Sequence, residues 1–322
     1  MKWLVTAVMM TVLLLANPVA AEWYRHDFNV MGTSASVELW SENQQQADLL
    51  IAQVVAEMER INQLLSPYIE SSELYRVNQL AATEAQNISP EFYWLLQRSI
   101  DFSKLSQGAF DITFASVGYR FQYRESVAPS EEFIQQHKAL IDFRSIELYE
   151  AGQVKFSKPN TRIDLGGIAK GYAVDRCIEL LQKAQVAHAF VKAGGDSRVL
   201  GDKRGRLWTI GIQHPRQPGA VLTQLPLENV AISTSGDYER FFIKNGERVH
   251  HIIDPTTGHS ANKSISVTIL ANDSTTADAL STTVFILGPE RGLKLIETLN
   301  NVSAIIIDSK GQFHYSSDLQ PQ

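Results

Sequence analysis

Two side chains four residues apart could hold a divalent cation. Asp278 and Thr282 lie in STTADALSTTVF, a segment whose pattern predicts a helix, and their spacing puts both on one helix face. A carboxylate and a hydroxyl are hard oxygen ligands of the kind that Mg²⁺ prefers, with waters or phosphate oxygens completing the shell. The alternative is a threonine hydroxyl that bonds back to the carbonyl of Asp278, as is common inside helices.

A glycine-rich stretch, DLGGIAKGYAVDR (164–176), could approach a phosphate. Gly166 and Gly167 would let the backbone come close to a ligand, and a helix beginning there would direct N–H groups at an anion. Lys170 could add a positive charge. The stretch matches neither the G-x-x-x-x-G-K-S/T loop nor the G-x-G-x-x-G fingerprint. A tight turn with a solvated lysine therefore remains an alternative.

Two other loops combine glycine with polar side chains. KAGGDSRVLG contains Gly195 and Asp196, and ISTSGDYERFF contains Ser235 and Asp237. Hydroxyls beside glycine suit phosphate oxygens, but ordinary turns in which Asp accepts backbone N–H groups have the same composition.

A histidine pair and one aromatic segment complete the candidates. His250 and His251 in HHIIDPTTG face opposite ways on a predicted strand, so at most one points into a given site. Tyr68, in LSPYIESSELYRVN, could stack on an aromatic ring. An ordinary packed tyrosine is the alternative, and each of these signals is weak by itself.

The elements that must position these residues mix irregularly along the chain, which predicts an α+β fold and one compact domain. Ser41, with Gln44 three residues later, predicts an N-cap and a helix to about Leu64. Ser89-Pro90 predicts a second helix, to about Leu105. Further helices are expected at EEFIQQHKALI, IAKGYAVDRCIELLQKA, STTADALSTTVFIL and PERGLKLIETL. Strands are expected at MGTSASVELW, on both sides of Ala151-Gly152, at AFVKAGG, RLWTIGI and SISVTIL, on both sides of Asn245-Gly246, and in a final hairpin.

Composition limits the classes of partner and the redox chemistry. The 322 residues are 44% hydrophobic and carry a formal net charge of −6, with no basic patch, which argues against nucleic acid as a partner. Cys177 is the single cysteine, so no intramolecular disulfide can form and stability must come from the core.

The N-terminal 21 residues have the pattern of a secretory signal peptide. Lys2 precedes an apolar stretch from Trp3 to Ala16, and Val19-Ala20-Ala21 is a small-residue cleavage site. The expected mature chain, 22–322, would be a soluble periplasmic protein. An uncleaved signal anchor is the alternative, whereas the absence of a nearby cysteine argues against a lipid anchor.

Eight ordered stretches between residue 31 and about residue 288 resemble the FAD:protein FMN transferase (ApbE) family. They are MGTSASVEL, LSPYIESSELYRVN, GAFDITFASVG, DLGGIAKGYAVDR, KAGGDSRVLG, ISTSGDYERFF, HHIIDPTTG and TTADALSTTVFILG. The resemblance implies an ApbE-type, T-fold-like catalytic domain over residues 22–322, with mixed or antiparallel sheets and packed helices. It also implies an Mg²⁺-dependent transferase that cleaves FAD, attaches FMN through a phosphoester to a Thr or Ser of another protein, and releases AMP.

The resemblance assigns roles to individual residues. The implied metal ligands are Asp278, Thr282 and the main-chain carbonyl of Ala169, and the implied catalytic residues are His251 and Asp237. Tyr68 matches the aromatic residue that packs on the isoalloxazine. The implied FAD-binding set is Met31, Tyr68, Ser72, Phe110, Asp111, Asp164, Gly166, Gly167, Lys170, Gly195, Asp196, Ser235, His251 and Ile253.

The chain departs from the family pattern in places. No proline follows GAFD, and Lys192-Ala193 precedes the second Gly-Gly, where family members often have Asn-Leu or a similar pair. The chain lacks an acceptor pattern of the type D-x-x-S/T-G-A-S/T, so the implied partner is another protein: a redox-pump subunit, which would involve at most transient membrane-protein contact, or a periplasmic flavoprotein. Two alternatives stay open, an Mg²⁺-dependent FAD pyrophosphatase giving FMN and AMP, and a non-catalytic periplasmic flavin-binding protein.

Overall fold

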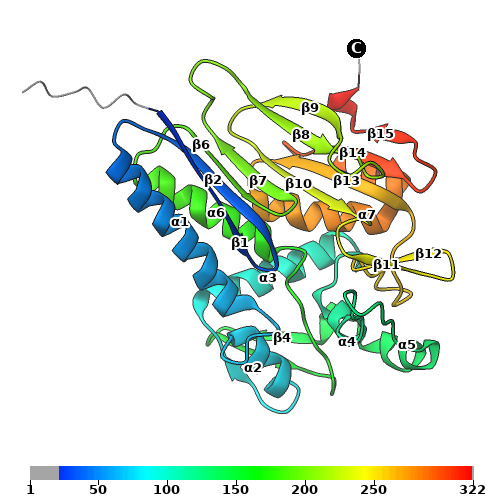
Figure 1. Cartoon of the computed structure of the whole chain (residues 1–322). Coiled ribbons are helices and arrows are strands. Elements are labelled where there is room, and N and C mark those ends of the chain that lie inside the picture. The colour runs from blue at the N-terminus through cyan, green and yellow to red at the C-terminus, as the bar shows by residue number, and fades with distance from the viewer. Residues whose placement is uncertain (1–21, 321–322) are drawn as a thin grey trace, which may run out of the picture.

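The computed structural model describes residues 22–320, and its centre is an eight-stranded antiparallel sheet (Figure 1). The strand order is β1-β2-β6-β7-β10-β13-β14-β15. The strands are β1 (Glu22–Val30), β2 (Thr33–Ser41), β6 (Ala189–Ala193), β7 (Asp196–Leu200), β10 (Ala231–Gly236), β13 (Ser264–Ala271), β14 (Ser303–Asp308) and β15 (Phe313–Tyr315). Strands distant in sequence are thereby neighbours, so the β6–β7 loop lies near the end of β10.

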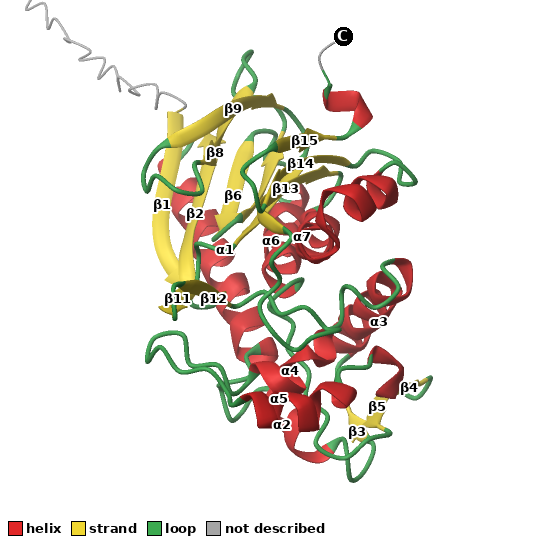
Figure 2. Cartoon of the chain, turned by 90° about the vertical axis from the view of Figure 1, so that its right-hand side faces the viewer, coloured by secondary structure: helices red, strands yellow, loops and turns green. Residues whose placement is uncertain are grey.

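Three helices cover one face of this sheet (Figures 1 and 2). They are α1 (Gln44–Leu65), α6 (Ala169–Lys183) and α7 (Ser274–Ile296). The apolar residues Ala169, Ala173, Cys177 and Leu181 form one stripe along α6, and all four are buried. Burial of that stripe against the sheet provides most of the stability of such a helix, because isolated helices of this length are marginal in water.

The chain between α1 and α6 forms a smaller helical part at one end of the sheet (Figure 2). Its helices are α2 (Glu73–Leu80), α3 (Pro90–Leu105), α4 (Ala115–Gly118) and α5 (Glu131–His137), with the 3-10 turns η1 (Ile112–Phe114), η2 (Lys138–Leu140) and η3 (Phe143–Ser145). A small sheet joins β3 (Gln86–Asn87), β5 (Gln153–Phe156) and β4 (Ile146–Tyr149). The remaining elements are the hairpins β8 (Trp208–Gln213) with β9 (Val221–Leu227) and β11 (Phe241–Lys244) with β12 (Glu247–His250), and the 3-10 turn η4 (Ser317–Leu319).

The predicted α+β class and single compact domain are confirmed, while one predicted cap is wrong. Asn43, not Ser41, caps α1, since its side chain accepts from the N–H of Gln46. Ser41 belongs to β2, where it pairs with Glu22, and its hydroxyl bonds the backbone of Asn43. The first strand, β1, was not predicted from the sequence.

The predicted break near residue 288 is confirmed. Gly288 has φ 77° and ψ 177°, which interrupts α7 and leaves two helical halves. The Asn245-Gly246 turn is confirmed as well, with φ 54° and 83°, as a type I′ hairpin requires.

Among residues 22–320, no helix is long and apolar enough to cross a membrane. The predicted signal peptide, 1–21, lies outside the described residues.

Candidate active site

The first half of α7 and the start of α6 are in direct contact at the predicted metal ligands. Asp278 is 2% exposed, and its Oδ2 accepts the N–H of Gly171 at 3.0 Å. A Cβ on Gly171 would lie 2.2 Å from the carbonyl oxygen of Ser274 and 2.7 Å from Cβ of Asp278. Only glycine therefore permits this approach of the two helices. A Cβ on Gly167 would lie 3.2 Å from Oγ1 of Thr282, so the second predicted ligand borders the same stretch.

Lys170 is not a free surface charge. Its Nζ lies 2.8 Å from Oδ2 of Asp196 and 3.4 Å from Oδ2 of Asp278, and it donates to the carbonyl of Gly166 at 3.1 Å. Burial alone would lower the pKa of Lys170, but the two carboxylates outweigh it and raise this pKa above its usual value. The lysine charge is thus already balanced within the protein.

Serine hydroxyls extend this cluster to a third and a fourth motif. Ser233 Oγ donates to Oδ1 of Asp196 at 2.6 Å. The Oγ atoms of Ser233 and Ser281 lie 3.0 Å apart. Ser281 Oγ is also 2.8 Å from Oγ of Ser235. Ser235 in turn lies 3.4 Å from Oγ1 of Thr282. We call Lys170, Asp196, Ser233, Ser235, Asp278, Ser281 and Thr282 the polar network. It brings together four sequence motifs that lie far apart in the chain.

The backbone around the polar network is fixed by two features. A Cβ on Gly195 would lie 2.4 Å from the carbonyl oxygen of Thr234, so glycine lets the β6–β7 turn reach β10. Asp175, on α6, accepts the N–H groups of Ser274 and Thr275 at 2.8 and 2.7 Å and so binds the start of α7. Sequence reasoning did not single out Asp175, because a cap supplied by another helix leaves no local pattern.

The donor set suits a hard divalent cation. Burial and the neighbouring Asp196 raise the pKa of Asp278 to about 7, although the charge of Lys170 opposes this rise. The negative charge of Asp278 is thus only partly compensated, and a cation bound beside it would stabilise that charge. Asp278 offers a carboxylate and Thr282 a hydroxyl, and Ala169 is the buried first residue of α6. Among residues 22–320, no three His, Cys, Asp or Glu side chains gather as a metal-binding group. The oxygen donors at this place are a carboxylate, a hydroxyl and a main-chain carbonyl.

The two histidines differ in their surroundings. His250 is satisfied in the core, where Nε2–H donates to the carbonyl of Ala261 at 2.7 Å and Nδ1 accepts from the N–H of Ile252 at 3.3 Å. His251 has a buried Nδ1 without a hydrogen-bond partner. Burial, and then the charges of Arg240, His250 and Lys170, lower the pKa of His251 to about 3. The imidazole of His251 is therefore neutral at ordinary pH, and its Nδ1 is not committed to any protein group that the structure describes.

This depressed pKa predicts a loss of stability in acid. The folded protein keeps His251 neutral down to about pH 3, whereas the unfolded imidazole takes up a proton near 6.5, so the free energy of unfolding should fall below pH 6.5. The slope from one such group is at most about 1.4 kcal/mol per pH unit. Urea unfolding at about pH 7 and about pH 5 measures it. In His251→Gln the difference between the two pH values should shrink, and an unchanged difference would contradict the assignment.

A second group of side chains lies beside His251. Tyr68 is 84% exposed, and Asp164 accepts the N–H of Gly166 at 2.6 Å. Arg240 donates to the carbonyl of Gly32 at 3.2 Å, next to Met31 in the β1–β2 turn. Burial raises the pKa of Asp164, while the N–H of Gly166 and the charges of Arg240 and Lys170 oppose that rise. Arg240 was missed from the sequence, where it is one arginine within YERFF.

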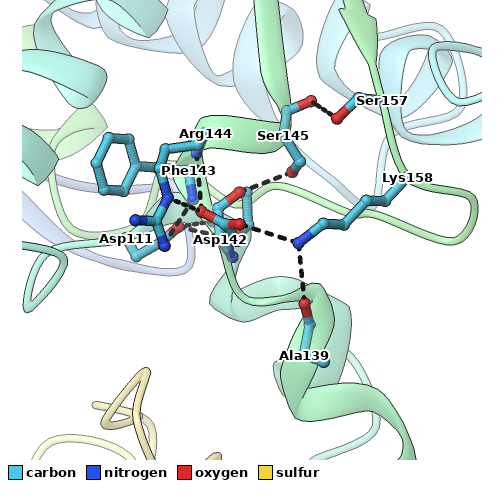
Figure 3. A network of polar contacts seen from close by, with 9 residues as sticks. Asp111, Ala139, Asp142, Phe143, Arg144, Ser145, Ser157 and Lys158 are labelled. Carbon is cyan, nitrogen blue, oxygen red and sulfur yellow. Dashed lines mark hydrogen bonds and ion pairs between the residues drawn. The ribbon is translucent and has the colours of Figure 1, made fainter.

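Several predicted site residues have well-defined structural contacts. The Ser72 side chain caps α2. The buried ring of Phe110 packs close to Gly167, since a Cβ on this glycine would lie 3.2 Å from the ring. Asp111 accepts the N–H groups of Thr113 and Phe143, each at 2.8 Å, beside the Asp142 ion pairs (Figure 3). Ile253 is buried in a small cluster with Val117, Phe121 and Ile134. These residues shape the loops around the site, and their predicted contacts with FAD stay predictions.

Asp237 is engaged by two arginines. Arg216, from the β8–β9 loop, binds both of its carboxylate oxygens at 2.6 and 2.7 Å, and Arg248 lies at 3.6 Å. A carboxylate held in this way positions its neighbours more readily than it accepts a proton. The catalytic role predicted for Asp237 stays a prediction.

Comparison with known proteins identifies similar sequences over most of the chain. The family model described as "ApbE family" matches residues 31–306. The FAD:protein FMN transferase of Haemophilus influenzae is 33% identical over 273 residues, covering 81% of this chain and 79% of that protein. The FAD:protein FMN transferase of Vibrio cholerae is 32% identical over 274 residues, covering 82% and 81%.

Solved structures are similar as well. The ApbE protein of Thermotoga maritima superposes with a TM-score of 0.84 at 33% identity, covering 92% of this chain and 98% of that one. The flavin transferase ApbE of Vibrio cholerae superposes with a TM-score of 0.82 at 28% identity and the same coverage.

Proposed function

The chain belongs to the ApbE family, and from this premise we propose that it is an FAD:protein FMN transferase. The proposed reaction is attack of an acceptor Thr or Ser hydroxyl on the FMN phosphorus of FAD. A phosphoester to FMN forms, the bond to AMP breaks, and AMP is released. The observation that carries the proposal is the convergence of Lys170, Asp196, Ser235 and Asp278 in one largely buried network, whose Lys170 charge acts on a histidine with an unpaired nitrogen.

We propose that Mg²⁺ is required and that Asp278, Thr282 and the carbonyl of Ala169 hold it. The oxygen donors and the raised pKa of Asp278 support this assignment. When bound, the ion would neutralise charge that develops on the phosphoryl oxygens.

The protein groups then position the substrate and move one proton. Nδ1 of His251 is neutral and unpaired, which suits it to accept the proton of the attacking hydroxyl. Tyr68 presents an exposed ring for stacking with the isoalloxazine. The Gly166–Gly167 backbone leaves room for the pyrophosphate.

The place of action is a further part of the proposal. The signal-peptide pattern of residues 1–21 supports export to the periplasm as a soluble enzyme. The acceptor would then be an exported redox protein that carries a D-x-x-S/T-G-A-S/T pattern.

The test mixes the purified protein, FAD, Mg²⁺ and an acceptor domain with that pattern, and intact mass spectrometry follows the acceptor. We expect a mass increase equal to FMN on the acceptor, release of AMP, and no adduct when the acceptor Thr or Ser is replaced by alanine. AMP and FMN without any adduct would replace the proposal with an FAD pyrophosphatase. Intact FAD after long incubation would replace it with a flavin-binding protein.

A further inference from the structure

We propose that Arg240 binds the phosphate that FMN retains, on the flavin side of the FAD pyrophosphate. This inference rests on the proposed function and adds a residue to the substrate site.

The register of the β11–β12 hairpin places Arg240 directly opposite His251. Phe241 pairs with His250, and the N–H of His251 donates to the carbonyl of Arg240 at 3.2 Å, so the antiparallel pairing continues by one residue. Residues directly opposite each other in an antiparallel pair project from the same face. The guanidinium group is therefore a neighbour of the imidazole that we assign as the proton acceptor.

One nitrogen of the guanidinium group is anchored to the β1–β2 turn. Nη2 donates to the carbonyl of Gly32 at 3.2 Å, and a Cβ on Gly32 would lie only 3.0 Å from this nitrogen. Gly32 also has φ +71°, a conformation that favours glycine. The turn thus holds the exposed Arg240 side chain in place and leaves its other donors available.

The guanidinium group of Arg240 has no ion-pair partner among the described residues, although its charge opposes the rise in the pKa of Asp164. Arg240 forms no ion pair with any carboxylate among residues 22–320, whereas Arg216 and Arg248 pair with Asp237. Lys170 is balanced by Asp196 and Asp278. An arginine whose forked donors stay uncommitted next to a reaction centre is suited to a phosphate, which accepts two parallel hydrogen bonds.

The neighbours of Arg240 indicate which of the two phosphates it meets. Its charge acts on Tyr68, Tyr123 and Asp164 and also on His251, whose N–H donates to the carbonyl of Arg240. We assign Tyr68 to the isoalloxazine and His251 to the hydroxyl that attacks the FMN phosphorus. A cation that neighbours both groups would therefore meet the phosphate that joins the ribityl chain, before the phosphate of AMP.

The experiment measures the dissociation constants of FMN and riboflavin by flavin fluorescence in one Mg²⁺-containing buffer. In Arg240→Gln, FMN should bind about 10- to 100-fold more weakly, the effect of losing a hydrogen bond between charged groups, while riboflavin changes by less than about twofold. Arg240→Lys should recover part of the FMN affinity, because it keeps the charge and loses the fork. Lys244→Gln removes a charge from β11, the strand that begins directly after Arg240, and should leave both constants unchanged.

Two results would overturn the inference: equal weakening of FMN and riboflavin binding, or unchanged FMN binding. Its failure can be told apart from failure of the proposed function. A wild-type protein that forms no adduct, while Arg240→Gln still loses FMN selectively, would leave the phosphate contact standing and reject the transferase. A wild-type protein that binds no FMN would reject both.

Discussion

Replacement of Asp278 by asparagine should slow FMN transfer by roughly 10³-fold or more, the scale of losing the metal's contribution to phosphoryl charge stabilisation. Asparagine keeps the shape and can still accept the N–H of Gly171, so the contact between α6 and α7 is retained. What disappears is the negative charge, and Lys170 keeps Asp196 as its partner. Single-turnover formation of the flavinylated acceptor, at several Mg²⁺ concentrations, measures the effect.

Asp273→Asn is the matched control for Asp278→Asn. Asp273 caps the same helix five residues earlier, and asparagine is an equally good cap, so stability and transfer rate should both stay close to wild type. A rate for Asp278→Asn within tenfold of wild type, with an unchanged Mg²⁺ dependence, would remove Asp278 from the metal site.

Replacement of His251 by glutamine should lower the transfer rate by about 10²- to 10⁴-fold, the range for loss of a general base. The reason is the buried Nδ1, which has no hydrogen-bond partner among the described residues and which we assign as the acceptor of the hydroxyl proton. Binding of an anionic pyrophosphate beside the imidazole should also raise its pKa from the low value of the free protein, which makes it a stronger base in the complex.

His250→Gln is the contrasting variant, because the ring of His250 is already hydrogen-bonded within the core. Loss of its bonds to Ala261 and Ile252 should lower the free energy of unfolding by about 1–3 kcal/mol and leave the rate of the folded fraction nearly unchanged. Rates and urea unfolding curves for the two variants separate the roles. If both variants lose rate equally at equal folded fraction, His251 is not the base.

Local signals predicted the elements well where one short segment carries all the information. The Ser89-Pro90 start of α3, the Asn245-Gly246 turn and the break before Pro289 depend on caps and on φ preferences of a few residues. The predicted N-cap of α1 was wrong because Ser41 and Asn43 are both good caps. Ser41 pairs with Glu22 at the end of β2, which leaves Asn43 as the cap. Strand pairing is a long-range property that a local pattern does not contain.

In the candidate site, too, local patterns were predictable from the sequence and long-range contacts were not. Asp278 and Thr282 were visible because their spacing along one helix is itself the signal. Lys170 was expected as an available charge, and its two carboxylate partners come from segments far away in the sequence. Arg240 was invisible for the same reason, since only the hairpin register and the contact with Gly32 distinguish it from other surface arginines.

The polar network has a consequence for how such a site can change by mutation. The hydroxyl of Ser281 is shared between Ser233 and Ser235, and Asp196 is shared between Ser233 and Lys170. Groups that share partners do not contribute independently, so the effect of one substitution depends on which residues occupy the other positions. Strong epistasis should therefore link α6, α7 and the β7 and β10 strands, and a motif taken from another sequence would require its partners to be exchanged with it.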